Sequence, residues 1–199
     1  MNLQTYTGGS VQTNGYLIEG PEGWVAIDAP SGFDTVIAKA NANIVGTLLT
    51  HQHFDHVESA HALPALQAYE PLNRDLVMDA RARENGLPVT VPDFTVEEIL
   101  KEKATVTLAG LIFQILHVPG HSPDSLAFYL ESENLLFAGD ALFHGSIGRT
   151  DLPGGDHETL LTSIRQDLYS LPEHTTVLPG HGPPTTIVQE KKTNPYVRG

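Results

Sequence analysis

The chain contains no cysteine, which excludes disulfide bonds and zinc sites built from thiolates. Any metal ion must therefore be held by nitrogen and oxygen atoms. Basic residues are also scarce, because 11 lysines and arginines stand against 24 acidic residues, for a formal net charge of −13. A surface of this sign repels polyanions, so we expect no nucleic-acid partner.

Long apolar runs are absent as well, and residues 1–4 lack the basic and apolar character of a signal segment. We therefore expect a cytoplasmic protein with no membrane partner. A chain of 199 residues, 40% of them hydrophobic, can bury a full core. We expect a single domain spanning residues 1–199, and the sequence gives no indication of its oligomeric state.

Segments with the periodicity of strands and of helices alternate along the chain, which predicts the α/β class. Strands are expected over residues 11–19, 24–28, 44–50, 104–108, 111–118, 125–131, 135–138 and 176–178. Helices are expected over residues 34–41, 58–69 with an interruption near Pro64, 157–170 and 184–192. Prolines punctuate residues 71–103, for which no element is predicted.

The densest chemical feature is a cluster of three histidines and one aspartate, His51, His53, Asp55 and His56. Neutral imidazole and carboxylate are preferred ligands of zinc and of other first-row divalent metals. Four such groups on one short segment suit two metal ions side by side better than one tetrahedral ion. Histidines also cluster in solvated loops and in expression tags. The internal position of this cluster, directly after an apolar run, favours the metal interpretation.

Three further ligand candidates share one local context, in which an apolar strand is followed by glycine and then by the polar residue. They are His121, Asp140 and His181. Glycine allows the tight turn that directs a side chain away from a strand end, and loops at strand ends commonly carry functional sites. Either histidine alone would be interpreted as a hydrogen-bonded loop residue. The repetition of the context favours a joint metal site.

Residues 50–56, together with His121, Asp140 and His181 in that order, resemble the metallo-β-lactamase superfamily over nearly the whole chain. The resemblance implies a four-layer αββα sandwich, with two sheets packed face to face and helices outside, and a dinuclear metal site. Zinc is the expected metal, with iron or manganese as alternatives. One ion would be held by His51, His53 and His121. The other would be held by Asp55, His56 and His181, with Asp140 bridging the two.

Asp28 ends an early expected strand, at a position where this family commonly has an aspartate that orients the histidine cluster. A plain turn carboxylate is the alternative interpretation of Asp28. The bridging position is Asp140 rather than cysteine, which is unlike a true β-lactamase. Residues 58–59 read Glu-Ser where two glycines are usual, a difference that concerns the shape of the loop rather than the metal ligands.

Residues 139–151 and 179–186, with Glu190 and Asn194 beyond them, resemble the glyoxalase II group, especially its short single-domain bacterial members. Those enzymes hydrolyse S-(2-hydroxyacyl)glutathione thioesters to a hydroxy acid and glutathione. The resemblance therefore implies a small-molecule thioester substrate. Larger members have Lys and Tyr where this chain has Arg149-Thr150-Asp151, and a C-terminal helical domain where only 18 residues follow His181. These differences concern glutathione recognition.

Three residues receive roles in the implied hydrolysis. Asp55 would orient the attacking hydroxide or take its proton. Arg149 would anchor a substrate carboxylate, since guanidinium binds carboxylates in a bidentate manner, and an ion pair with Asp151 or Asp156 is the alternative. His144 would line the same loop. The remaining histidines outside these sets, His61, His117, His157 and His174, are interpreted as non-ligands, with His157 exposed near the start of a helix.

Other functions remain open at this stage. Persulfide dioxygenases share this fold and a Gly-Arg-Thr-Asp segment like residues 148–151, and use a single iron, here on His51, His121 and Asp140. Lactone or phosphodiester hydrolysis on the same fold is another alternative, and the acidic composition argues against an RNA substrate. A metal-binding protein without catalytic activity is disfavoured because all seven ligand positions are filled.

Overall fold

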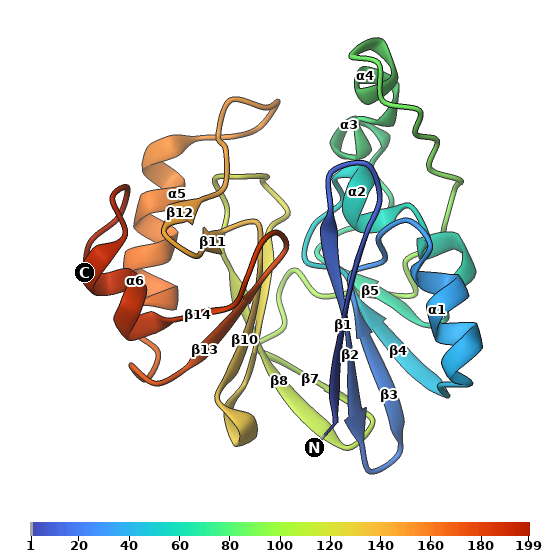
Figure 1. The fold of residues 1–199 in the computed structure, drawn as a ribbon, viewed down its shortest axis with the longest axis horizontal. Helices are drawn as coiled ribbons and strands as arrows, with labels where there is room; N and C mark the ends of the chain where they lie inside the picture. The colour runs from blue at the N-terminus through green and yellow to red at the C-terminus, as the bar shows by residue number, and fades with distance from the viewer. Residues whose placement is uncertain (1) are drawn as a thin grey trace. The chain divides into compact units, whose positions relative to one another are not determined.

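The computed structural model describes residues 2–199, which divide into two compact units (Figure 1). The first unit contains the chain up to Lys101 together with Thr107–Leu111, and the second contains Glu102–Val106 and Ile112–Gly199. The structure has two six-stranded sheets with accompanying helices, which confirms the predicted α/β class. The single-domain organisation stays a prediction.

The sheet of the first unit has the order β1-β2-β3-β4-β5-β6. Its strands are β1 (Leu3–Gly8), β2 (Thr13–Gly20), β3 (Gly23–Ile27), β4 (Ile44–Leu48), β5 (Leu66–Ala68) and β6 (Glu98–Ile99). The first three strands form antiparallel pairs, and β3 to β6 are parallel. The strands β3 and β4 end together, because Ile27 is paired with Leu48. The segments that leave these two strands therefore start at the same edge of the sheet.

The helices of the first unit are short. They are α1 (Phe33–Ala40), α2 (Phe54–Val57), the 3-10 helix η1 (Ala60–Ala62), α3 (Arg74–Val77) and α4 (Asp79–Glu84). The helix predicted over residues 34–41 is confirmed as α1, which buries Phe33 and Ile37 and ends at Asn41 in the left-handed conformation. The strands predicted over residues 11–19 and 24–28 are confirmed as β2 and β3, which pair antiparallel, whereas β1 was not predicted.

The helix predicted over residues 58–69 is wrong. After η1 the chain turns at Pro64 and at Ala65, which has a φ of 47°, and then runs as β5 beside β4. Proline disfavours continuation of a helix, and pairing with a buried parallel strand satisfies the backbone of Leu66–Ala68 in its place. Tertiary hydrogen bonding therefore overrides the helical periodicity of this segment.

Residues 71–103, which gave no pattern, are organised around the buried carboxylate of Asp79. It accepts hydrogen bonds from Arg74, Arg83 and the amide of Val91. Burial acts to raise the pKa of Asp79, but the hydrogen bonds from Arg83 and Val91, with the charges of both arginines, hold it below its usual value. The carboxylate thus ties α3 and α4 to the loop that follows them.

The sheet of the second unit has the order β14-β13-β10-β9-β8-β7. Its strands are β7 (Thr105–Leu108), β8 (Leu111–His117), β9 (Leu126–Leu130), β10 (Leu135–Gly139), β13 (Thr176–Pro179) and β14 (Thr185–Thr186). The strands predicted over residues 104–108, 111–118, 125–131 and 135–138 are confirmed as β7 to β10, with β7 beside β8 and β9 beside β10 in the sheet. The strands β10 and β13 are parallel and end together, with Gly139 paired to Pro179 and the Gly180 amide donating to the Gly139 carbonyl over 2.8 Å.

Two helices and a small hairpin complete the second unit. The helix α5 (His157–Ser163) continues as a π-helical turn, η3 (Ile164–Leu168), which agrees with the helix predicted over residues 157–170. The helix α6 (Ile187–Thr193) begins later than predicted, because Thr185 and Thr186 pair with β13 instead. A short 3-10 helix, η2 (Glu131–Glu133), joins β9 and β10, and β11 (Leu142–Phe143) pairs with β12 (Ser146–Ile147).

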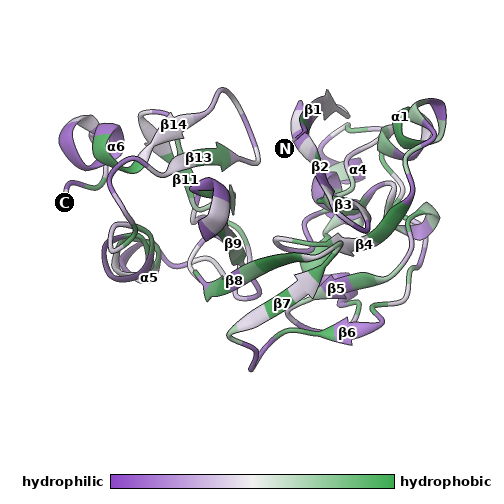
Figure 2. Ribbon diagram, turned by 90° about the horizontal axis from the view of Figure 1, so that it is seen from below, coloured by the Kyte–Doolittle hydropathy of each residue, from purple (hydrophilic) through white to green (hydrophobic). Residues whose placement is uncertain are grey.

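Burial explains why these elements pack as they do. One apolar cluster of the second unit unites Leu160, Ile164 and Leu168 with residues of β10 and β13, including Leu136 and Val177. In Figure 2 the strands β8 and β13 are largely hydrophobic, whereas α5 and α6 carry hydrophilic segments. Among the described residues, none of the helices combines the length and apolar character that a membrane crossing requires.

Gly120 provides a test of how α5 packs. It has a φ of 126°, and a Cβ at this position would lie 2.3 Å from the backbone nitrogen of Leu160. We expect Gly120→Ala to lower the free energy of unfolding by about 2–5 kcal/mol, from backbone strain and overpacking together. Urea denaturation measures the change. Gly86→Ala is the matched control, because Gly86 also has a positive φ but nothing lies within 4 Å of the added methyl group. Equal losses in both variants would contradict close packing at Gly120.

Candidate metal centre

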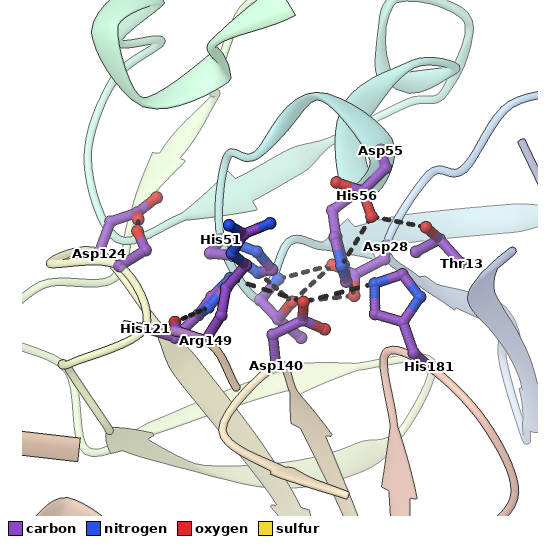
Figure 3. A network of polar contacts seen from close by, with 12 residues as sticks. Thr13, Asp28, His51, Asp55, His56, His121, Asp124, Asp140, Arg149 and His181 are labelled. Atoms are coloured by element: carbon purple, nitrogen blue, oxygen red, sulfur yellow. Dashed lines mark hydrogen bonds and ion pairs between the residues drawn. The ribbon is translucent and has the colours of Figure 1, made fainter. Parts of the chain in front are cut away.

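The four ligand candidates of the first unit follow directly from the end of β4. His51 and His53 lie in the connecting segment, and Asp55 and His56 lie in α2. All four side chains are buried. The ring centroid of His51 lies 4.6 Å from that of His53 and 4.1 Å from that of His56. Three imidazoles thus share one small buried region, in which Figure 3 labels His51 and His56.

Asp28 orients His56. Its Oδ2 lies 2.8 Å from Nδ1 of His56, and because an ionised carboxylate only accepts, Nδ1 carries the proton. The other ring nitrogen, Nε2, then has its lone pair available for a metal ion. Asp28 has a φ of 59°, a conformation that aspartate tolerates better than most residues. The parallel pairing of β3 and β4 brings Asp28 to this place.

Thr50 extends the influence of Asp28 to His51. The Thr50 amide donates to Oδ1 of Asp28 over 2.7 Å, and its hydroxyl lies 2.9 Å from Oδ2. The same hydroxyl lies 3.1 Å from Nδ1 of His51. If the hydroxyl donates to the carboxylate, it accepts from His51, so Nδ1 of His51 carries the proton as well. One buried carboxylate therefore sets the tautomer of two imidazoles.

Two residues that the sequence did not single out hold this cluster in place. Thr13 at the start of β2 donates its hydroxyl to Oδ2 of Asp55 over 2.6 Å. Gln52 is buried and turns away from its histidine neighbours, so that its amide donates to the carbonyl of Pro71 and accepts from the amide of Asn73. No local pattern reveals either role, because each partner lies far away in the sequence.

Glu58 adds negative potential beside this cluster. It stands where the family usually has a glycine, and its side chain is hydrogen-bonded to Ser31. Burial and the charge of Asp55 raise the pKa of Glu58, and the hydrogen bond from Ser31 partly opposes this. The raised pKa thus reflects mainly the burial of this carboxyl group, with a further contribution from the negative charge of Asp55.

The second unit contributes His121, Asp140 and His181, which follow β8, β10 and β13 (Figure 3). Oδ2 of Asp140 lies 3.5 Å from Nε2 of His121 and 3.4 Å from Nε2 of His181. Nδ1 of His121 donates to the carbonyl of Arg149 over 2.8 Å, which leaves Nε2 as the atom with the lone pair. A single carboxylate oxygen thus lies close to two histidine nitrogens.

Gly148 permits this arrangement. The chain returns past Asp140 after the β11–β12 hairpin, and a Cβ at Gly148 would lie 1.9 Å from the Asp140 carbonyl oxygen and 3.2 Å from Cβ of His121. Only glycine allows so close an approach. The backbone that follows Gly148 then brings the Arg149 carbonyl to His121.

The distances fit metal ligation better than direct hydrogen bonding. Two ligands of one tetrahedral ion, with bonds of about 2.0–2.1 Å, lie about 3.3–3.4 Å apart. The pairs of Asp140 with His121 and His181 lie at 3.5 and 3.4 Å, and Asp55 Oδ2 lies 3.5 Å from His56 Nε2. Good hydrogen bonds to nitrogen are shorter, about 2.7–3.2 Å. All seven residues belong to groups of histidines and aspartates that could hold a metal ion, and the set is compatible with a dinuclear site.

The predicted substrate contacts lie beside these ligand candidates. Arg149 forms a bidentate ion pair with Asp151, in which both distances are 2.7 Å, and both side chains are exposed. The hydrogen bond to Asp151 raises the pKa of Arg149 further. His144 is exposed at the turn of the β11–β12 hairpin, and the neighbouring Phe143 meets the ring of His181 edge-on.

The histidines interpreted as non-ligands lie elsewhere. His117 bonds to the Pro123 carbonyl, and His174 bonds to the side chain of Asn134. His61 is exposed in η1, and His157 is exposed at the first position of α5, as predicted.

Comparison with known proteins agrees with this site. A family model described as the metallo-beta-lactamase superfamily matches residues 8–181. The hydroxyacylglutathione hydrolase GloC of Haemophilus influenzae is 37% identical, over 99% of this chain and 98% of its own. The probable metallo-hydrolase YqgX of Bacillus subtilis is 34% identical, over 96% of this chain and 95% of its own.

Solved structures with the same fold include TTHA1623 in a di-iron-bound form, with a TM-score of 0.84 and 40% identity over 98% of this chain and 100% of the other. The BLEG-1 B3 metallo-beta-lactamase has a TM-score of 0.88 and 33% identity, over 100% of both chains. The fold expected from the sequence, an α/β sandwich of the metallo-β-lactamase type, is thereby confirmed. With its histidines and aspartates at the strand ends, the chain belongs to the metallo-β-lactamase superfamily and is a metallo-hydrolase of that superfamily.

Proposed function

We propose that the protein is a dinuclear metal-dependent thioester hydrolase that cleaves S-(2-hydroxyacyl)glutathione to a hydroxy acid and glutathione. The observation that carries the proposal is Asp140, whose Oδ2 lies within 3.5 Å of the ring nitrogens of both His121 and His181, as a bridging carboxylate requires. The similarity to GloC over nearly the full length of both chains supports the choice of substrate.

The assignment of ligands follows the family resemblance. His51, His53 and His121 would hold one ion, and Asp55, His56 and His181 the other, with Asp140 between them. The donor set suits zinc, iron or manganese alike, and zinc is our first expectation. The di-iron form of TTHA1623 supports iron as an alternative. The tautomers of His51, His56 and His121 described above leave the nitrogen needed for ligation in each ring.

Bound divalent ions would supply a water of lowered pKa and would stabilise the negative charge that develops on the thioester carbonyl oxygen. The carboxylate of Asp55 would orient that water or take its proton, and the hydroxyl of Thr13 holds this carboxylate by donating to Oδ2. The leaving group is a thiolate, whose conjugate acid has a pKa of about 8.5, so that no strong general acid is needed.

Arg149 is the proposed anchor for a carboxylate of the substrate. Its guanidinium is exposed and already engaged by Asp151, so that a substrate carboxylate must compete with that ion pair. Exposed pairs of this kind contribute little free energy, and exchange of one carboxylate for another is therefore accessible. His144 and Phe143, on the hairpin beside His181, would line the same substrate region.

Hydrolysis of β-lactams is the second candidate, because the BLEG-1 B3 metallo-beta-lactamase is 33% identical to this chain over its full length. The two functions use the same water-activating chemistry and differ in the bond that is cleaved. Parallel assays of the purified protein with S-lactoylglutathione and with a chromogenic cephalosporin distinguish them. We expect turnover of the thioester. Turnover of the cephalosporin alone would overturn the proposal.

The metal content of the purified protein tests the dinuclear assignment. Seven ligand groups in two sets predict about two divalent ions per chain. Elemental analysis of protein purified without added metal, read together with thioesterase activity, measures this. A single ion that is exclusively iron, with oxygen consumed in the presence of a persulfide, would instead indicate the dioxygenase alternative.

The second prediction concerns Asp140. Because its carboxylate would contact both ions, Asp140→Ala should lose bound metal and nearly all thioesterase activity together. His174→Ala is the matched control and should keep both, since His174 is exposed and is hydrogen-bonded to Asn134 rather than to a ligand candidate. Metal analysis and kcat/KM report the outcome, and a fully metallated Asp140→Ala with near-normal turnover would remove Asp140 from the site.

The third prediction concerns Arg149. Loss of a charge-assisted hydrogen bond worth roughly 1.5–3 kcal/mol should raise KM for a glutathione thioester about tenfold or more in Arg149→Ala, with kcat and metal content little changed. The Arg149 carbonyl that bonds to His121 belongs to the backbone and remains in this variant.

Asp151→Asn serves as the companion variant for Arg149. It releases the guanidinium from its present partner, so KM should stay constant or fall. An unchanged KM in Arg149→Ala would show that the Arg149 side chain serves only its ion pair with Asp151. A fall in kcat instead would indicate that the side chain supports the catalytic loop.

A further inference from the structure

A buried carboxylate near the end of the chain takes no part in the chemistry described above. Glu190 in α6 has no exposed surface. It accepts hydrogen bonds from the Thr185 hydroxyl over 2.5 Å, the Gly145 amide over 2.9 Å and the Asn194 side-chain amide over 2.8 Å. All three donors are neutral. A buried carboxylate is costly unless it is fully hydrogen-bonded, so its presence calls for a role that an apolar side chain could not fill.

Two of the three partners of Glu190, Gly145 and Thr185, lie on segments that follow metal-ligand candidates. Gly145 is in the turn of the β11–β12 hairpin, which begins two residues after Asp140. Thr185 is in β14, four residues after His181. One side chain therefore connects the segments downstream of Asp140 and of His181.

Asn194 strengthens the same connection. Its side-chain amide donates to the Ser146 carbonyl over 3.0 Å as well as to Glu190, and its Oδ1 accepts from the amides of Tyr196 and Val197. Every hydrogen-bonding group of this buried side chain is thereby used. The β11–β12 hairpin is thus held at Gly145 by Glu190 and at Ser146 by Asn194.

The hairpin in turn contacts a ligand candidate. The ring of Phe143 lies edge-on to the imidazole of His181, with 6.0 Å between the centroids and an angle of 83°. His181 is the most exposed of the ligand candidates, with 27% of its side chain accessible, so the surrounding protein constrains it least. A displaced hairpin would remove the contact that Phe143 makes with this ring.

We propose that Glu190 is a positioning residue of the metal site, which acts through the hairpin and β14 to hold Asp140 and His181 in register with each other. The inference rests on the proposed function, in which Asp140 bridges two ions and His181 binds the second. Residues that orient metal ligands indirectly commonly change metal affinity by about 10–100-fold when they are replaced.

The test compares four proteins, the wild type, Glu190→Ala, Glu190→Gln and Tyr169→Phe. Two quantities are measured, the affinity for the second ion by titration of Zn²⁺ into metal-free protein and the exchange rate of the Gly145 amide by NMR. Steady-state kinetics with a glutathione thioester provide kcat and KM. The Tyr169→Phe control removes a hydrogen bond from the same chain end, at the Val197 carbonyl, without touching the hairpin.

In Glu190→Ala, the Gly145 amide should exchange at least about tenfold faster, and the second ion should bind about tenfold more weakly. At limiting zinc kcat should fall, and KM should change little. In Glu190→Gln the Gly145 exchange rate and the affinity for the second ion should both be close to those of the wild type. The amide oxygen of glutamine can accept from Gly145 and Asn194 while its NH₂ group donates to the Thr185 oxygen. Tyr169→Phe should resemble the wild type in both.

Two results would overturn the inference about Glu190 and leave the proposed function unaffected. Wild-type affinity for the second ion in Glu190→Ala, despite faster Gly145 exchange, would show that the network is purely structural. An equal loss of affinity for the second ion in Tyr169→Phe and in Glu190→Ala would show that any disturbance of the chain end weakens the site. A wild-type protein that binds no second ion would overturn the dinuclear function, and this inference with it. If Glu190→Ala does not fold, the isosteric Thr185→Val decides. This variant removes only the hydrogen bond from Thr185 to Glu190 and should weaken binding of the second ion severalfold. Unchanged affinity for that ion would refute the inference.

Discussion

Two parallel strand pairs, one in each unit, determine where the polar side chains of this protein can act. The pairing of β3 with β4 places Asp28 beside Thr50 and the histidines that follow. The pairing of β10 with β13 ends both strands together, so that Asp140 and His181 leave the sheet side by side. Because parallel strands deliver their carboxyl ends to one edge, polar residues distant in sequence become neighbours there.

The sequence identified the ligand candidates because each follows an apolar strand directly, and that context is local. It did not reveal that Thr13 contacts Asp55, Gln52 contacts Asn73 and Glu190 contacts Gly145, because these pairs are 42, 21 and 45 residues apart. Nothing in the neighbouring residues of Thr13 indicates that its hydroxyl meets Asp55. Roles that depend on pairing between distant segments follow from the fold and cannot be obtained from periodicity or spacing alone.

The error over residues 58–69 has the same origin. Residues 60–62 do form a helical turn, but Pro64 and the positive φ of Ala65 end it, and Leu66–Ala68 finds backbone partners on β4. Periodicity describes which face of a segment is apolar, and a short buried strand can satisfy the same pattern. The helix over residues 157–170 was predicted well because its apolar residues pack against the sheet at every turn, even across its π-helical part.

The two ways of orienting an imidazole in this site have different chemical consequences. His56 donates to the carboxylate of Asp28, whereas His121 donates to the backbone carbonyl of Arg149. A carboxylate partner makes the opposite ring nitrogen a stronger base than a carbonyl partner does, so His56 should be the better electron donor of the two. The carbonyl at position 149 is independent of the side chain there. The guanidinium is therefore able to change its partner, from Asp151 to a ligand, without disturbing the ring of His121. In the function proposed above, Arg149 would therefore orient a metal ligand through its backbone carbonyl and bind the substrate through its side chain.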